Sequence, residues 1–171
     1  MRRTLVTAVA LALASFSAAS TAAPAAPTVA MGRADTTTQL PRNVVPTHYD
    51  VAITPDIGHL TLAGKATITV QVLEATPSIT LNALDMAFSS ASLTPAQGKG
   101  RALTPRIALD NAAQTATFTF DKPLAPGAYR LALDYTGKIG TQANGLFAID
   151  YDTRAGNKRA LFTQFENSDA R

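Results

Sequence analysis

Apolar and polar residues alternate along most of the chain beyond residue 40. The clearest case is the segment 64–74, which reads GKATITVQVLE. Its even positions from Ala66 to Val72 are apolar, and its odd positions from Lys65 to Gln71 are polar. Because successive side chains of a β-strand point to opposite faces, this alternation predicts a strand with one buried and one solvated face. The β-branched residues that fill it favour the same structure.

The same period of two recurs before and after this segment. Tyr49, Val51 and Ile53 stand at alternate positions in a stretch bounded by Pro46 and Pro55, which predicts a strand with one buried face. Further strands are predicted over 78–84, 87–95, 107–110, 115–124 and 128–137. Segments rich in Gly and Pro separate them, as expected of turns.

The last part of the chain has the pattern of a β-hairpin. The first strand is predicted from Leu146 to Tyr151, and the second from Arg159 to Gln164. Between them, Ala155-Gly156-Asn157 supplies the residues of a turn. We therefore expect two antiparallel strands here.

These strands predict an all-β fold. No helical period longer than a turn occurs outside the N-terminus, and about eight or nine short strands with turns every 8–12 residues are typical of a β-sandwich. We expect an antiparallel β-sandwich or a bent, saddle-shaped double sheet over residues 40–171. About 130 residues are enough to bury a core of this kind.

The first 39 residues have a different character. Arg2 and Arg3 precede an apolar run from Leu5 to Phe16, and the small residues Ser20-Thr21-Ala22 follow. The run is too short to span a bilayer of roughly 30 Å, so residues 1–22 are predicted to be a secretory signal peptide, without a transmembrane anchor, that exports the protein to the periplasm or the medium. Residues 23–39, rich in Ala, Pro and Thr, are predicted to be a flexible spacer.

Composition excludes several classes of function. The net charge is +3, but Arg2 and Arg3 lie in the predicted signal peptide; the rest of the chain has 13 Lys and Arg against 12 Asp and Glu. A nearly neutral domain has no general attraction for nucleic acid, and we exclude that class of partner. The absence of Cys excludes disulfides and thiol chemistry.

No set of residues forms a complete catalytic site. His48 and His59 lack any H-E-x-x-H spacing, so both are expected to be surface groups or to support a neighbouring side chain, with no metal bound. No Ser lies in a G-x-S-x-G context. Asp150 and Asp152 have no nearby acid partner and are expected to solvate the hairpin. The chain alone should not catalyse a reaction.

An ordered set of segments resembles the N-terminal domain of the M1 zinc metallopeptidases, the aminopeptidase N and leukotriene A4 hydrolase group. These segments are LPRNVVPTHYDVAITPD, GKATITV, ITLNAL, PLAPGAYRLALDYTGKI and the terminal TQFENSDAR. The resemblance covers residues 40–171 and implies a saddle-shaped β domain. It also implies that the zinc and its H-E-x-x-H ligands belong to a following catalytic domain. Neither this motif nor the family's Gly-x-Met-Glu-Asn motif is in the sequence, so we expect the chain to stop before that domain.

The resemblance assigns roles to the end of the chain. It implies that Glu166 lies at the active-site cleft and binds the α-ammonium of a peptide substrate, and that Gln164 shapes the pocket for the first residue. Because Gln164 is two positions earlier on an extended strand, its side chain is expected on the same face as Glu166, with Phe165 packed on the other. Thr163 is expected to stabilise the strand, and Asp169 and Arg171 to form an interdomain or structural pair.

Two functions remain open from the sequence. The first is the N-terminal domain of an exported zinc aminopeptidase, with the N-terminus of a peptide and the catalytic domain as its partners. The second is a free-standing exported β-sandwich that binds a ligand or serves as an accessory module, because one fold hosts many functions. The 6% aromatic content and the absence of Trp argue against a sugar-binding platform. An in-frame H-E-x-x-H beyond Arg171 would favour the peptidase.

Overall fold

The computed structural model describes residues 40–97 and 100–165. The predicted signal peptide and spacer, as well as Glu166, Asp169 and Arg171, lie outside the described residues. Within the described residues there are nine β-strands and no helix, so no helix there is long and apolar enough to cross a membrane. The strands are β1 (Val44–Asp56), β2 (Thr61–Val72), β3 (Thr76–Asn82), β4 (Met86–Pro95), β5 (Arg106–Asp110), β6 (Thr115–Leu124), β7 (Gly127–Lys138), β8 (Gly145–Thr153) and β9 (Gly156–Gln164).

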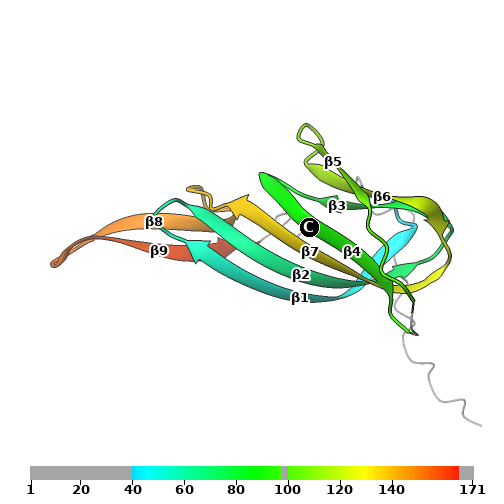
Figure 1. Cartoon of the computed structure of the whole chain (residues 1–171). Helices are drawn as coiled ribbons and strands as arrows, with labels where there is room; N and C mark the ends of the chain where they lie inside the picture. Colours follow the sequence, from blue (N-terminus) through cyan, green and yellow to red (C-terminus); the bar gives the residue numbers. More distant parts are fainter. Residues whose placement is uncertain (1–39, 98–99, 166–171) are drawn as a thin grey trace, which may run out of the picture. The chain divides into compact units, whose positions relative to one another are not determined.

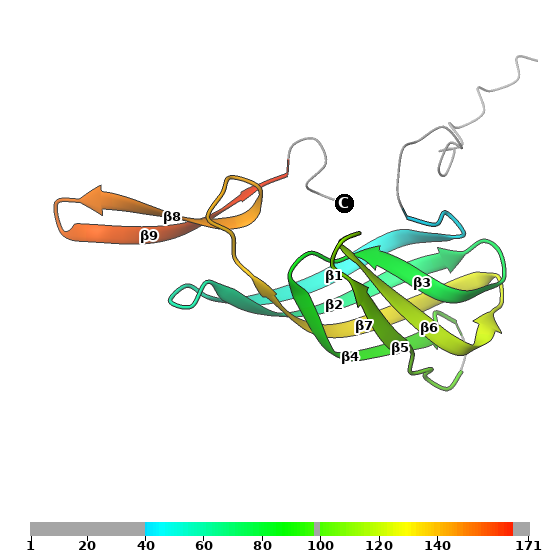
Figure 2. The ribbon, with the colours of Figure 1, turned by 90° about the horizontal axis from the view of Figure 1, so that it is seen from above.

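Seven of the strands form two antiparallel sheets that share one core. The larger sheet has the order β1-β2-β7-β4, and the smaller has the order β3-β6-β5. Figure 1 shows the four strands of the larger sheet side by side, and Figure 2 shows the smaller sheet lying across one of its faces. Strands β8 and β9 form a separate two-stranded sheet. The prediction of an all-β antiparallel sandwich is confirmed.

The core consists of the apolar residues that alternate along the strands. Ile68 of β2 and Leu93 of β4 both lie opposite Leu131 of β7, and all three are at most 4% exposed. From the smaller sheet, Phe118 of β6 is fully buried and packs edge-to-face on Phe88 of β4, with ring centroids 5.3 Å apart. The sandwich is therefore held together mainly by apolar burial between its sheets.

Polar side chains cover the other face of the larger sheet. Lys65 of β2 forms an ion pair with Asp134 of β7, N to O 3.4 Å, and Ser90 of β4 donates a hydrogen bond of 2.6 Å to the same carboxylate. These contacts lower the pKa of Asp134, the hydrogen bond from Ser90 being the largest cause. The predicted alternation of buried and solvated faces is confirmed for β2, β6 and β7.

Strand β1 differs from its prediction in two ways. It runs through Pro46 and Pro55 rather than ending at them, because an edge strand tolerates proline. Its apolar face is also not buried: Tyr49, Val51 and Ile53 are each about half exposed, at 53, 54 and 47%. The smaller sheet has three strands against four, and it leaves this edge of the larger sheet largely uncovered.

Candidate functional site

The β8–β9 hairpin carries the described part of the predicted substrate-binding segment. Its strands pair from Gly145 opposite Gln164 to Thr153 opposite Gly156, which leaves a two-residue turn at Arg154 and Ala155. The turn lies earlier in the chain than the predicted Ala155-Gly156-Asn157. Gly156 is already in the ladder, with a φ of 98° that favours glycine, and Thr153 Oγ1 donates a 2.7 Å hydrogen bond to its carbonyl.

Gln164 lies at the base of the hairpin and is exposed. Its partner across the ladder is Gly145, which has no side chain to cover it. On the same face, the rings of Phe147 and Phe162 stack with centroids 6.1 Å apart. Phe147 is buried, whereas Phe162 is 46% exposed. The predicted pocket residue is therefore an accessible amide beside a partly exposed aromatic ring.

The neighbours of Gln164 differ in how well they were predicted. Thr163 occupies a ladder position opposite Leu146, as expected of a residue that supports the strand. Phe165 was expected to be packed on the face opposite Gln164, and this is wrong for the described residues: it is 50% exposed. The common orientation of Gln164 and Glu166 stays a prediction, because Glu166 is not among the described residues.

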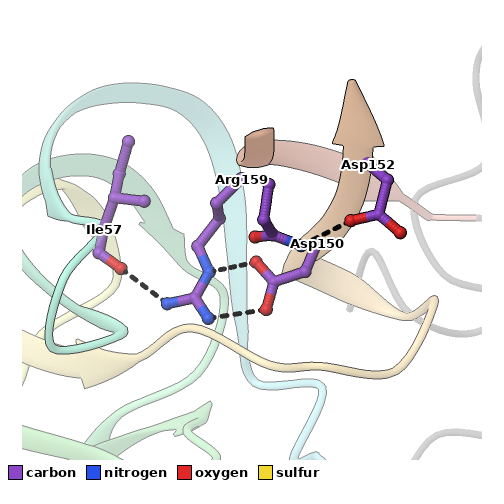
Figure 3. A network of polar contacts seen from close by, with 5 residues as sticks. Ile57, Asp150, Asp152 and Arg159 are labelled. Atoms are coloured by element: carbon purple, nitrogen blue, oxygen red, sulfur yellow. Dashed lines mark hydrogen bonds and ion pairs between the residues drawn. The ribbon is translucent and has the colours of Figure 1, made fainter. Parts of the chain in front are cut away.

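The opposite face of the hairpin carries a bidentate ion pair. Asp150 of β8 lies directly across from Arg159 of β9, whose Nε and Nη2 donate hydrogen bonds of 2.6 and 2.8 Å to the two carboxylate oxygens (Figure 3). The pair lowers the pKa of Asp150 and raises the pKa of Arg159, in both cases mainly through the hydrogen bonds. Asp150 was expected only to solvate the hairpin, and its partner was not predicted. Asp152 accepts a 3.3 Å hydrogen bond from Asn157.

Arg159 also links the hairpin to the turn between β1 and β2. Its Nη1 donates a 3.2 Å hydrogen bond to the carbonyl oxygen of Ile57 (Figure 3). In the same turn, Asp56 accepts hydrogen bonds from the backbone N–H of His59, at 3.0 Å, and pairs with its Nδ1, at 2.8 Å. The guanidinium of Arg159 and the turn that contains Ile57 are therefore each held by further hydrogen bonds.

The Asp56–His59 pair should be visible in a titration. The hydrogen bond to Asp56 raises the pKa of His59 above its ordinary 6.5. Since the folded pKa of His59 is the higher one, the pair stabilises the turn fully below pH 6.5, as long as Asp56 stays ionised, and it ceases to do so as the pH rises through the folded pKa of His59. We expect the ring protons of His59 to titrate above 6.5 by NMR, and those of the Asp56→Asn variant to titrate near 6.5. A wild-type pKa at or below 6.5 would contradict the pairing.

The described residues do not provide a metal site. His48 pairs with Asp50, Nε2 to Oδ1 3.3 Å, and His59 with Asp56, and both histidines are exposed, as predicted. No group of three His, Cys, Asp or Glu side chains within residues 40–97 and 100–165 is placed to hold a metal ion. A zinc ion that needs three or four such ligands does not fit this donor set.

Comparisons of the sequence with a family model and with known proteins indicate the same family. The model of the Peptidase M1 N-terminal domain matches residues 45–171. Aminopeptidase N of Acetobacter pasteurianus is 39% identical over 134 residues, and Aminopeptidase 2 of Candida albicans is 35% identical over 133 residues. Aminopeptidase M1 of Arabidopsis thaliana is 29% identical over 135 residues.

The matches cover most of this chain but a small part of each relative. They include 78, 77 and 78% of this chain, and 36, 14 and 15% of the respective relatives. The family match extends over β1 to β9, including the hairpin with Gln164, and continues to Arg171. The chain therefore belongs to the Peptidase M1 N-terminal domain family.

Proposed function

We propose that this chain is the N-terminal domain of an exported, zinc-dependent aminopeptidase, and that it recognises the free amino end of peptide substrates. The observation that carries the proposal is the family match over residues 45–171. The relatives named above are all aminopeptidases, which supports peptide hydrolysis as the activity of the whole protein. In this proposal Glu166 binds the α-ammonium group, and Gln164 forms part of the pocket for the first residue.

The chemistry of a carboxylate suits this role. An aminopeptidase must distinguish a free N-terminus from an internal amide of the same chain. An ammonium donates charge-assisted hydrogen bonds to a carboxylate, whereas an internal amide N–H donates one weaker bond and carries no charge. A hydrogen bond to a charged group contributes about 1.5–3 kcal/mol, which is about a 10- to 100-fold difference in affinity. Glu166 can therefore select substrates without taking part in bond cleavage.

The surroundings of Gln164 support its place in a pocket wall. Its amide can donate and accept hydrogen bonds, and it lies exposed opposite Gly145. The exposed part of the Phe162 ring is on the same face of β9. A polar group beside an apolar surface is the usual composition of a small-molecule or side-chain pocket.

The zinc ion would be held by residues outside this sequence. When bound there, it would polarise the scissile carbonyl and activate water. We expect the purified 171-residue chain to show no turnover of aminoacyl-p-nitroanilides with added zinc, and the complete product of the coding sequence to hydrolyse them. Turnover by the 171-residue chain alone would contradict the proposal that the zinc ion is held by residues outside this sequence. A stop codon after Arg171 in a folded, inactive product would favour the stand-alone module instead.

Export is proposed from residues 1–22. The charged start, apolar run and small residues at 20–22 have the order of a secretory signal. We expect mass spectrometry of the secreted protein to show an N-terminus at Ala23. A cell-associated product that retains Met1 would contradict this proposal.

A further inference from the structure

We propose that Arg159 is a positioning residue: it fixes the β8–β9 hairpin to the turn between β1 and β2, and thereby sets the place of Gln164 at the end of β9. The proposal rests on the function proposed above, because it concerns the same substrate-recognition segment. Its basis is the network of contacts made by one guanidinium group (Figure 3).

The three contacts of Arg159 use three different nitrogens. Nε and Nη2 bind the two oxygens of Asp150 at 2.6 and 2.8 Å, and Nη1 binds the carbonyl oxygen of Ile57 at 3.2 Å. The carboxylate fixes the plane of the guanidinium, so Nη1 points in a set direction. Lysine cannot reproduce this geometry, because its ammonium is a single point of charge.

The ion pair itself is worth little as a source of stability. The Arg159 and Asp150 side chains are 34 and 48% exposed, and exposed pairs are screened by solvent. The pair also joins two strands that already form a continuous ladder. What Arg159 adds is a contact between the hairpin and a residue 102 positions earlier in the chain.

A second attachment lies at the base of the hairpin. Gly140 donates a 2.9 Å hydrogen bond to the carbonyl oxygen of Leu146 and accepts one of 2.9 Å from the N–H of Ala148. If this attachment were alone, the hairpin could rotate about its base. The contact at Arg159, near the middle of β9, restricts this rotation. It leaves the opposite face of the hairpin, which carries Gln164, accessible.

Orientation of the hairpin matters to recognition because a carboxylate and an amide must reach the same substrate end. Displacements of about 1 Å at such groups can reduce rates by about two orders of magnitude. Loss of the link should therefore weaken binding of the substrate amino end and raise KM, while kcat changes less, because the bond-breaking groups are elsewhere.

Exchanging the residues at positions 150 and 159 distinguishes an effect on the position of the hairpin from an effect on its stability. In the double variant Asp150→Arg/Arg159→Asp the ion pair across the ladder is retained, but no donor remains at position 159 for the carbonyl of Ile57. Arg159→Leu removes both contacts. The chain has no cysteine, so Arg154→Cys in the hairpin turn and Glu74→Cys after β2 can be spin-labelled selectively in each background.

The test combines spin-label distances in the 171-residue chain with kinetics of the complete gene product. In both the exchange variant and Arg159→Leu, we expect the distance distribution to broaden and KM for aminoacyl substrates to rise about tenfold, with kcat within about twofold of wild type. A wild-type distribution and KM in the exchange variant would overturn the positioning role alone. Absence of peptidase activity in the wild-type gene product would overturn the proposed function, and the positioning role with it.

Discussion

Replacement of Glu166 by alanine in the complete gene product is expected to raise KM for aminoacyl substrates about 10- to 100-fold. Under the proposed function, the variant would lose the charge-assisted hydrogen bonds to the substrate ammonium and would leave the bond-breaking groups in place. We therefore expect kcat to fall much less than kcat/KM. Steady-state kinetics with a series of dipeptides and aminoacyl-p-nitroanilides measures both quantities.

Two further variants make this result specific. Glu74 is the only other glutamate in the chain and is exposed after β2, so Glu74→Ala should keep wild-type kinetics. Glu166→Gln keeps the size of the side chain and removes its charge, and it should resemble Glu166→Ala in KM. Wild-type KM in Glu166→Ala, or an equal increase in Glu74→Ala, would show that the carboxylate at 166 does not bind the amine.

Replacement of Phe118 by alanine is expected to lower the free energy of unfolding by about 3–5 kcal/mol. The ring is fully buried between the two sheets and packs on Phe88. Its removal takes apolar surface out of the core and leaves a cavity. Since single domains are stable by about 5–15 kcal/mol, much of the stability of the sandwich should be lost. Urea unfolding followed by circular dichroism measures the change.

Phe162→Ala is the matched control for this substitution. Phe162 is 46% exposed and lies in the hairpin, so the same change should cost no more than about 1–2 kcal/mol. Equal losses in the two variants would mean that the core between the sheets does not dominate stability. A much larger loss in Phe118→Ala would support the packing described above.

The period of two in the sequence was sufficient to predict the sandwich but not which faces are covered. Strands β2, β6 and β7 follow the prediction because each lies opposite residues of the other sheet in the core. Strand β1 has the same period, yet Tyr49, Val51 and Ile53 are half exposed. Alternation shows that a strand can bury a face. Whether a second layer lies over that face depends on the number and order of strands in both sheets, which a local pattern does not contain.

The candidate site was predicted in part, and the reasons differ by residue. The hairpin could be predicted from the residues of its turn. In the observed register, Gly156 follows a two-residue turn, and Asp150 therefore lies opposite Arg159. The contact between Arg159 and Ile57 spans 102 positions and depends on how β1 and β2 end, so no local signal could indicate it. The family was predicted from ordered segments and is confirmed, whereas the role of Glu166 stays a prediction.

The most direct test of the proposed amine recognition uses two inhibitors that differ by one group. We would measure Ki in the complete gene product for an α-amino hydroxamate and for the same hydroxamate without its amino group, in wild type and in Glu166→Ala. Wild type should bind the amino compound at least about tenfold more tightly, and the variant should bind both about equally. If the variant keeps the full preference for the amino compound, Glu166 does not bind the amino end of the substrate.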